Sequence, residues 1–249
     1  MFSVTSKVMT KLRIKEFILR FKADTNLMSN KDSTIIFRSF CNKSALSNEE
    51  KKKCIERLKK FKFSQNQDSV NLQNAAVLIP LCSVNGEDSL LYTLRRQDLK
   101  VHKGQVSFPG GKQDSKDLSL EITALRETEE ELGISQSSVE VWGHGNSIIG
   151  REFNILPVLG HVGEIDIETL KPNPSEVEFA FTVPLNHFYD LKNCRYTQYR
   201  NGVGYILPVY INAKCKIWGI TALITHLVLN ALSPKQYTHK LHFIKPVIS

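Results

Sequence analysis

The sequence predicts an α+β or α/β sandwich, in which helices pack against the faces of a β-sheet. Short apolar runs separated by turn residues recur along much of the chain, as is typical of strands. Two longer stretches, residues 118–132 and 217–232, show apolar residues at helical spacing instead. With 249 residues, 41% of them apolar, the chain is long enough to bury a complete core without disulfides.

Six of the apolar runs are expected to be strands: 75–81, 89–94, 139–143, 155–162, 178–183 and 204–210. The first two flank Asn85-Gly86-Glu87-Asp88, which predicts a hairpin. Ahead of them, Ser47-Asn48-Glu49-Glu50 has the spacing of a capping box and predicts a charged helix that ends near Lys60.

The net charge of +8 is concentrated in the first quarter of the chain. Residues 1–63 hold 16 Lys and Arg against 6 Asp and Glu, whereas residues 64–249 hold 17 against 19. The main domain therefore has no cationic surplus, and we expect no nucleic-acid partner.

The first residues scatter bases among apolar side chains, which is typical of an organellar transit peptide. A basic amphipathic helix on the folded surface has the same composition and is the alternative. We divide the chain into a probable transit peptide at 1–30, a lead-in segment with the charged helix at 31–68, and the main domain at 69–249. The leader favours a mitochondrial location, with the peroxisome and the cytoplasm as alternatives.

The spacing of the cysteines and the hydropathy of the chain indicate whether disulfides or membrane spans are expected. The five cysteines are widely spaced, with no CxxC pair, and are expected to be free thiols. No window reaches the roughly 20 apolar residues of a membrane span, so we expect no membrane partner. Residues 217–232 come nearest and are predicted to form a buried helix. The sequence indicates no oligomeric state.

Three glutamates give the helix predicted at 118–132 its chemistry. On an ideal helix Glu127, Glu130 and Glu131 fall within an arc of roughly 100°. Carboxylates this close repel one another unless a cation neutralises them, and their oxygens suit Mg²⁺ or Mn²⁺. Glu129 points away from them. The apolar stripe is expected on the opposite side of the helix and comprises Leu118, Ile122, Leu125 and Leu132.

Glycines flank this helix on both sides. Gly110-Gly111 predicts a turn free of side chains, where the backbone could approach a bound phosphate. Gly133 predicts the end of the helix. A solvated acidic helix face would explain the glutamates alone, but the glycines and the carboxylate spacing together favour a metal and phosphate site.

The stretch resembles the Nudix box, G-x5-E-x7-REUxEExGU, in which U is apolar. The matching residues are Arg126, Glu127, Glu130, Glu131, Gly133 and Ile134. Gly111 lies one residue further upstream than in the pattern, which leaves Asp117 or Glu121 as the upstream acid, and Thr128 replaces an apolar residue. The resemblance implies a Nudix fold, with a mixed β-sheet between helices in an α/β/α sandwich, and metal-dependent hydrolysis of a diphosphate bond.

A longer resemblance, over about residues 75–225, is to the coenzyme A diphosphatase branch of the Nudix superfamily. Its blocks include Gly104-Gln105-Val106-Ser107-Phe108-Pro109-Gly110-Gly111, Asn173-Pro174-Ser175-Glu176-Val177 and Ile217-Trp218-Gly219-Ile220-Thr221-Ala222. The chain departs from this branch at Arg96, where a small residue is usual, and at Lys100, where Arg is usual. The resemblance implies that coenzyme A, or an acyl-CoA, is cut to 3′,5′-ADP and the corresponding 4′-phosphopantetheine.

The resemblance also implies roles for individual residues. The metal ligands would be Glu127, Glu130 and Glu131, holding one to three Mg²⁺ or Mn²⁺ ions. The catalytic set would comprise Glu127, Glu130, Arg126 and Glu176, with Arg126 positioning a carboxylate and with Glu130, Glu176 or Glu178 as the general base. The substrate-binding set would comprise Arg95, Lys100, His102, Gly110 and Gly111. Trp218 is either a core residue or a stacking surface for the substrate.

Two other functions stay open at this point. The same metal chemistry would hydrolyse ADP-ribose, NAD(H) or another dinucleotide. A catalytically inactive Nudix-fold module would bind coenzyme A, acyl-CoA or RNA, although pure binding does not require three crowded carboxylates.

Overall fold

The computed structural model describes residues 46–61, 72–98, 103–150, 152–199 and 205–243, which belong to one compact unit spanning residues 44–249. The transit peptide expected at 1–30 and much of the lead-in segment lie outside the described residues. Their assignment, and the domain boundary at residue 69, stay predictions.

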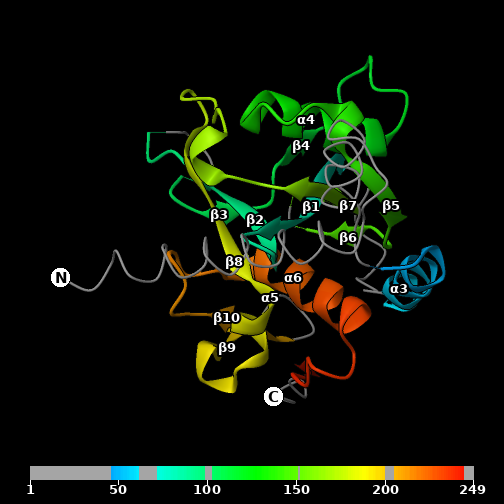
Figure 1. Ribbon diagram of the computed structural model, residues 1–249, viewed down its shortest axis with the longest axis vertical. Helices are drawn as coiled ribbons and strands as arrows, with labels where there is room; N and C mark the ends of the chain where they lie inside the picture. The colour runs from blue at the N-terminus through cyan, green and yellow to red at the C-terminus, as the bar shows by residue number, and fades with distance from the viewer. Residues whose placement is uncertain (1–45, 62–71, 99–102, 151, 200–204, 244–249) are drawn as a thin grey trace, which may run out of the picture. The chain divides into compact units, whose positions relative to one another are not determined.

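The main sheet is mixed and has eight strands. Figure 1 shows how they are arranged. Its central pair, β1 and β7, is parallel, and the other pairings are antiparallel. The path runs β3-β2-β1-β7-β5, with β4 paired to β1, β6 to β7 and β8 to β2. The strands are β1 (Gln73–Val84), β2 (Glu87–Arg95), β3 (Val106–Ser107), β4 (Gly110–Lys112), β5 (Glu140–His144), β6 (Ile148–Ile149), β7 (Phe153–Glu164) and β8 (Val177–Pro184).

A second, three-stranded sheet lies beyond α6 in the order β11-β10-β9. Its strands are β9 (Cys194–Tyr199), β10 (Tyr205–Tyr210) and β11 (His242–Phe243). The α-helices among the described residues are α3 (Asn48–Lys60), α4 (Leu120–Leu132), α5 (Leu185–Tyr189) and α6 (Gly219–Leu232). Short 3-10 turns occur at η1 (Gln136–Ser138), η2 (Ile167–Thr169) and η3 (Leu191–Asn193).

Two local predictions are confirmed at atomic detail. The β1–β2 hairpin pairs Val84 with Glu87 across Asn85 and Gly86, whose φ angles of 53° and 79° fit the turn that this dipeptide favours. The capping box of α3 is also formed, because Ser47 Oγ accepts from the backbone N–H of Glu50 while the Glu50 carboxylate accepts from the N–H of Ser47.

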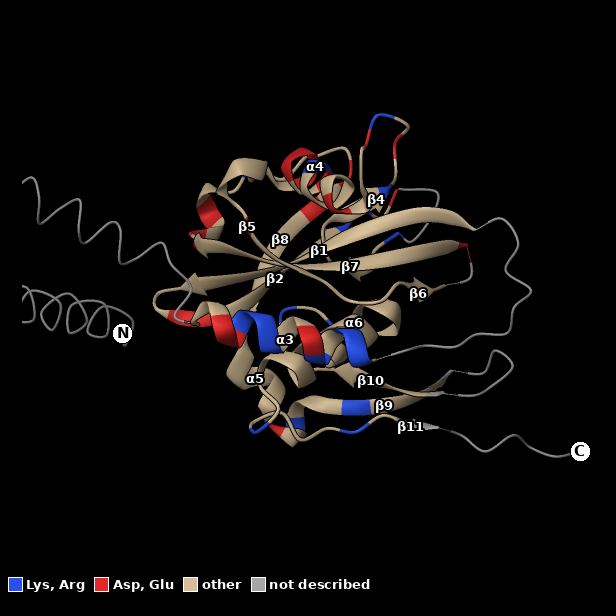
Figure 2. Cartoon of the chain, turned by 90° about the vertical axis from the view of Figure 1, so that its right-hand side faces the viewer, with Lys and Arg blue, Asp and Glu red and all other residues tan. Residues whose placement is uncertain are grey.

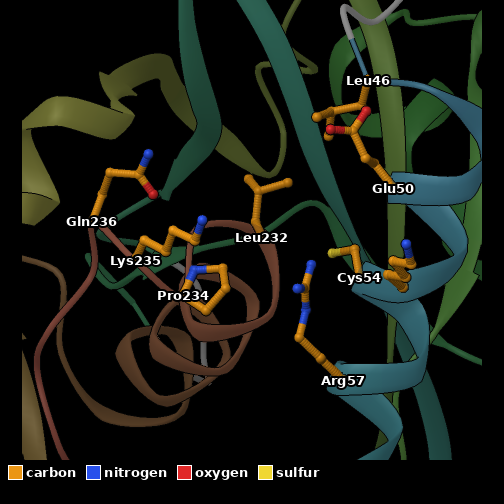
Figure 3. A pocket seen from close by; sticks show the side chains of 9 residues that line it. Leu46, Glu50, Cys54, Arg57, Leu232, Pro234, Lys235 and Gln236 are labelled. Carbon is orange, nitrogen blue, oxygen red and sulfur yellow. The ribbon is translucent and has the colours of Figure 1, made fainter.

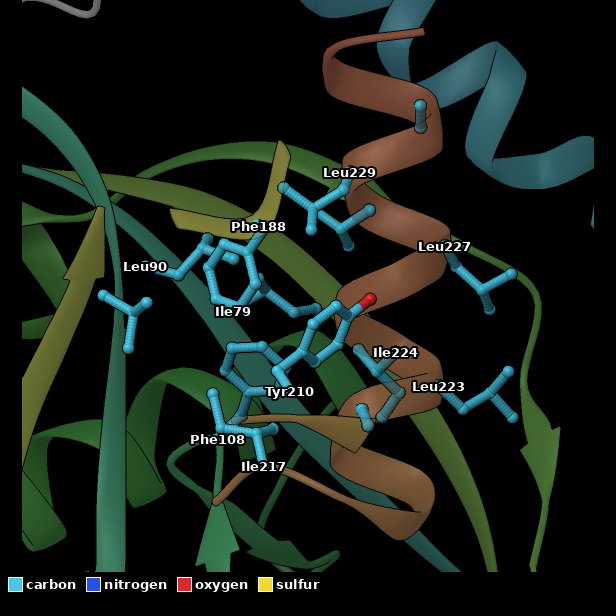
Figure 4. Packing of buried hydrophobic residues seen from close by; sticks show 14 of the residues in the cluster. Ile79, Leu90, Phe108, Phe188, Tyr210, Ile217, Leu223, Ile224, Leu227 and Leu229 are labelled. Atoms are coloured by element: carbon cyan, nitrogen blue, oxygen red, sulfur yellow. The ribbon is translucent and has the colours of Figure 1, made fainter. Parts of the chain in front are cut away.

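The main sheet is covered on both faces, which explains the continuous apolar runs of β1 and β2. Successive strand residues point to opposite faces. Ile79 and Leu90 join the core that contains α3 and α6, whereas Leu78 and Leu91 join the two smaller clusters on the α4 side. Figure 2 shows α4 on one side of the sheet and α3 and α6 on the other. Figure 4 shows the larger core packed around α6.

The predicted apolar stripe of α4 is confirmed for Leu132, which is buried, and for Leu125, which packs against a core cluster, but it is wrong for Leu118 and Ile122. The helix begins at Leu120, so Leu118 lies before it and is 91% exposed, and Ile122 is 36% exposed. The buried face instead carries Thr123, Ala124, Thr128, Glu131 and Leu132. Small side chains at its centre bring the helix close to β1, and this face includes one of the three glutamates.

The turn expected at Gly110-Gly111 is also wrong, because both residues belong to β4, which pairs with β1. At Gly110 the φ is +153°, and an added Cβ would lie 2.3 Å from the carbonyl oxygen of Ala76. Only glycine fits this approach of two backbones.

The second predicted helix is confirmed as α6, buried from Thr221 to Leu229. Trp218 just before it is 44% exposed, so the core interpretation of this residue is wrong. The four cysteines within the described residues are free. Among the described residues no helix is both long and apolar enough to cross a membrane.

Candidate active site

Helix α4 carries the predicted carboxylates and is fixed at both ends. Ser119 caps its N-terminus by accepting from the N–H of Ile122 at 3.2 Å. Gly133, in the left-handed conformation at φ +69°, ends the helix as predicted. Thr128, which replaces an apolar residue of the Nudix box, is buried, and its hydroxyl donates to the carbonyl of Ala124 at 2.7 Å.

Arg126 joins three carboxylates into one network. Its Nε and Nη2 donate to the two oxygens of Asp117, each at 3.0 Å. Nη2 also donates to Glu127 Oε1, and Nη1 donates to Glu130 Oε2, both at 3.0 Å. A further bond from Nη2 to the carbonyl of Lys112, at 3.1 Å, ties the guanidinium to β4. Arg126 thus sets the positions of Glu127 and Glu130 in this structure.

Asp117 anchors Arg126 from the loop before α4. The hydrogen bonds from Arg126 lower the pKa of Asp117 to about 2, despite the opposing effect of burial. Thr123 Oγ1 and the N–H of Asp114 donate to the same carboxylate, each at 2.9 Å. Of the two upstream acids left open by the sequence, Asp117 is therefore the one that pairs with Arg126.

Glu127 packs directly against the backbone of β4. An added Cβ on Gly111 would lie 2.5 Å from Cδ and Oε1 of Glu127, so the missing side chain makes room for the carboxylate. The side chain of Glu127 is 16% exposed. Burial raises its pKa, and the charges of Glu130 and Glu176 add to that effect, while Arg126 opposes it.

Glu131 is the most buried of the three glutamates, with its side chain 3% exposed. Burial raises its pKa to about 8, although Arg95, whose Nη1 lies 3.5 Å from Oε1, opposes the shift. Its other oxygen, Oε2, is buried and has no hydrogen-bond partner. Burying a carboxylate oxygen without a hydrogen-bond donor costs free energy, and a bound cation would offset that cost.

Glu130 differs from its two neighbours because its side chain is 56% exposed. The three glutamates share one side of the helix as predicted, yet their surroundings range from solvent to full burial. Repulsion between them is reduced by two arginines, because Arg126 pairs with Glu127 and Glu130 and Arg95 pairs with Glu131.

Glu176 lies near this cluster, and Glu178 does not contribute to it. The charge of Glu176 raises the pKa of both Glu127 and Glu131. The loop that carries Glu176 is tied to the end of α4 by the bond from Asn173 N–H to the carbonyl of Glu131, at 2.9 Å. Glu178 follows on β8 and is exposed.

Arg96, one of the departures from the coenzyme A diphosphatase pattern, fastens the same loop. Its guanidinium donates to both oxygens of Asp98, at 2.8 and 2.7 Å, and to the carbonyl of Pro174 at 2.7 Å. The backbone N–H of Arg96 donates to the carbonyl of Glu176 at 3.0 Å. The end of β2 and the Glu176 loop are thereby held together.

The predicted substrate residues are only partly placed. Arg95, Gly110 and Gly111 lie beside the carboxylates of α4, as the contacts above show. Lys100 and His102 lie outside the described residues, so their roles stay predictions. Asp117 was predicted only as an alternative to Glu121 for the upstream acid, because its pairing with Arg126 depends on how the loop before α4 folds back.

A family model for the NUDIX domain matches residues 72–201, more than half of the chain. The chain belongs to the Nudix family. Its α4 is therefore the helix of the Nudix box. Arg126 on this helix pairs with Asp117, which precedes the helix, and with Glu127.

Named relatives are similar over most of the Nudix domain. The mitochondrial coenzyme A diphosphatase NUDT8 of Mus musculus is 46% identical over 167 residues, covering 66% of this chain and 80% of that protein. The protein of the same name from Homo sapiens is 44% identical, covering 68% and 73%. Nudix hydrolase 3 of Caenorhabditis elegans is 33% identical over 224 residues, covering 81% and 92%. The chain is accordingly a member of the Nudix hydrolases.

The donor chemistry of the Nudix helix fits a hard divalent cation, although the described residues contain no group of three His, Cys, Asp or Glu side chains that could hold a metal ion in their present positions. In this structure the carboxylates are paired with arginines, Glu127 and Glu130 with Arg126 and Glu131 with Arg95. Oε2 of Glu131 has no hydrogen-bond partner, and the carboxylate of Glu127 is packed against Gly111. A divalent cation bound beside these two carboxylates would offset the cost of burying their charge.

Proposed function

We propose that the protein hydrolyses the diphosphate bond of coenzyme A, and of acyl-CoA, to 3′,5′-ADP and (acyl-)4′-phosphopantetheine. One observation carries the proposal: Glu127 and Glu131 are buried on α4 with raised pKa values, and Oε2 of Glu131 has no hydrogen-bond partner that would offset its burial. Two relatives that are 44% and 46% identical bear the name coenzyme A diphosphatase, which supports the choice of substrate.

Glu127, Glu130 and Glu131 are the residues that would hold Mg²⁺ or Mn²⁺. Such a cation, when bound, neutralises charge that develops on the transferred phosphoryl group and lowers the pKa of water. Arg126 is a positioning residue, because its guanidinium orients Glu127 and Glu130. Asp117 in turn holds the guanidinium of Arg126 in place.

The substrate's phosphates would meet the cations and glycines at the end of β2 and on β4. Arg95 lies within reach of the carboxylate cluster, and Lys100 and His102 follow it in the chain. Gly110 and Gly111 would act through the position of β4, because Gly110 lets it approach β1 and Gly111 leaves room for the Glu127 carboxylate. Lys100 supplies a charge without the planar fork of arginine, so we expect it to attract phosphate rather than orient it.

The proton acceptor for the attacking water would be Glu176 or Glu130. Glu176 is half-buried and its charge acts on the two buried carboxylates, and Glu130 is exposed. The bonds of Arg96 to Pro174 and Glu176 hold the Glu176 loop against β2, which favours Glu176 as the better-positioned base.

The test is an assay of the purified full chain with coenzyme A and ADP-ribose, with and without Mg²⁺, in which the products are identified by mass. We expect Mg²⁺-dependent release of 3′,5′-ADP and 4′-phosphopantetheine, and a higher kcat/KM for coenzyme A. A higher kcat/KM for ADP-ribose would contradict coenzyme A as the preferred substrate but would be consistent with metal-dependent hydrolysis. No turnover of either compound would contradict the enzymatic proposal.

We further propose a mitochondrial location, supported by the basic leader and by the names of the two diphosphatase relatives. Fluorescent fusions with and without residues 1–30 test it. Loss of mitochondrial signal on removal of these residues is the expected result, and an unchanged distribution would contradict the transit peptide.

A further inference from the structure

A pocket with a surplus of cations lies between α3 and the segment that follows α6, on the opposite face of the sheet from α4. Its volume is about 250 Å³. Figure 3 shows Arg57 reaching from α3 toward α6, with Lys235 and Pro234 on the far side. The lining comprises Leu46, Glu50, Lys53, Cys54, Arg57, Leu232, Pro234, Lys235 and Gln236.

The charges that line this pocket favour an anion. Three cations, Lys53, Arg57 and Lys235, line the pocket with a single acid, Glu50. Lys53 also forms an exposed ion pair with Glu49 at 3.0 Å, outside the lining. The Glu50 carboxylate is already engaged, because its Oε2 accepts from the backbone N–H and the hydroxyl of Ser47 at 2.8 and 2.7 Å. Cys54 adds no negative charge, since burial raises the pKa of its thiol to about 11.

Arg57 supplies the observation that points to a ligand. Its Nε is buried and has no hydrogen-bond partner, and the hydrogen bonds and ion pairs of the described residues do not include Arg57. Buried polar groups are nearly always satisfied, so the buried Nε of Arg57 at the pocket wall calls for an acceptor. Arg126 shows the contrast, because it donates to three carboxylates and a carbonyl.

A structural role for Arg57 at the end of α6 does not explain its position. Cations often bind the last carbonyls of a helix, and α6 has no basic residue in its last turn. Among the described residues, no hydrogen bond joins the Arg57 guanidinium to these carbonyls, and its Nε has no partner. The final N–H bonds of that turn are made within the chain, from Ser233 to Leu229 and from Tyr237 to Ser233.

We propose that this pocket binds a phosphate group, either free phosphate or the phosphate of a small monoester, through Arg57, Lys53 and Lys235. The planar fork of arginine matches phosphate oxygens, and the two lysines add charge. A volume of about 250 Å³ is below the roughly 300–1,000 Å³ of pockets for drug-sized ligands, which excludes a whole coenzyme A. Leu232 and Pro234 provide an apolar wall for a short organic group.

The experiment is a titration of the full-length protein, free of divalent cations, followed by the backbone amide signals in NMR spectra. Inorganic phosphate and glycerol 3-phosphate are the two probes. We expect saturable shifts at Leu232 and Lys235, and a Kd at least about tenfold weaker in Arg57→Met. Lys59→Met is the matched control, because Lys59 is exposed on the same helix and does not line the pocket, and it should bind as the wild type does.

Each outcome decides the proposal. Equal Kd values for the two probes identify free phosphate as the ligand, and tighter binding of glycerol 3-phosphate identifies a monoester. Shifts confined to α4 and β4 would overturn the proposal, because they would place the phosphate at the Nudix helix. If Arg57→Met does not fold, Lys235→Met replaces it, and wild-type affinity in the folded variant would equally overturn the proposal.

Discussion

The carboxylate of Glu127 fills the space that a side chain would take at Gly111, with its Cδ 2.5 Å from the position of an added Cβ. The two residues are 16 positions apart in the chain, and they meet because β4 pairs with β1 beneath α4. The glycine of the Nudix pattern therefore acts here by making room for a carboxylate.

Gly111→Ala should displace Glu127 and lower kcat for coenzyme A by about 100-fold, as expected for a misplacement of about 1 Å in a catalytic group. Steady-state kinetics measures this effect. Gly86→Ala is the control, because its φ of +79° makes the substitution strained while its surroundings are open. Gly86→Ala should lower the free energy of unfolding and leave kcat unchanged. An equal loss of kcat in both variants would show that Gly111→Ala acts through general destabilisation and not through Glu127.

Asp117→Asn should release Arg126 from its anchor. We expect a loss of about 1–3 kcal/mol in the free energy of unfolding, because buried donors lose a charged acceptor. The folded pKa of Asp117, about 2, is below the unfolded value of about 3.9, so its stabilisation is present above pH 4 and is lost as the pH falls toward 2. Urea denaturation at neutral pH and near pH 3 measures both effects. A difference between wild type and variant that is the same at both pH values would contradict this role.

The burial of His226 should make the free energy of unfolding sensitive to acid in a second pH range. It is 3% exposed, and burial lowers its pKa to about 4, while Tyr237 and Asn230 contact its two ring nitrogens at 2.8 and 2.9 Å. The unfolded pKa is about 6.5, so the unfolded state binds the proton more tightly and stability falls as the pH drops from about 6.5 to 4. The wild type should lose up to about 3 kcal/mol over this range through His226.

The comparison of wild type with His226→Gln tests this step, with the unfolding free energy measured at pH 7 and pH 4.5. The variant should be less stable at pH 7 and should lose less stability on acidification. A drop as large as that of the wild type would assign the acid sensitivity to other groups.

Local sequence signals predicted much of the fold. The Asn85-Gly86 hairpin and the Ser47–Glu50 capping box depend on residues within four positions of one another, and both are formed. The strands that were not predicted include β3, β4, β6 and β11, which have two or three residues each. Runs this short have no periodicity, because pairing with a distant strand defines them.

The site was predicted in its residue types but not in its surroundings. A helical wheel placed Glu127, Glu130 and Glu131 together, yet it put the core partly on the wrong side, because it counted Leu118 and Ile122 and ignored Ala124 and Thr128. The contact between Arg95 and Glu131 joins β2 to α4 across 36 positions, and no local pattern encodes it. The burial of Glu131 follows from that tertiary packing.

The most direct test of the proposed activity compares Glu127→Gln with Glu129→Gln in the Mg²⁺-dependent hydrolysis of coenzyme A. Glu129 is exposed on the same helix and bonds to Gln136 at 2.8 Å, away from the carboxylate cluster. We expect Glu127→Gln to lower kcat by about 100–1,000-fold and Glu129→Gln to keep wild-type turnover. Wild-type turnover in Glu127→Gln, with its fold intact, would contradict catalysis at this helix.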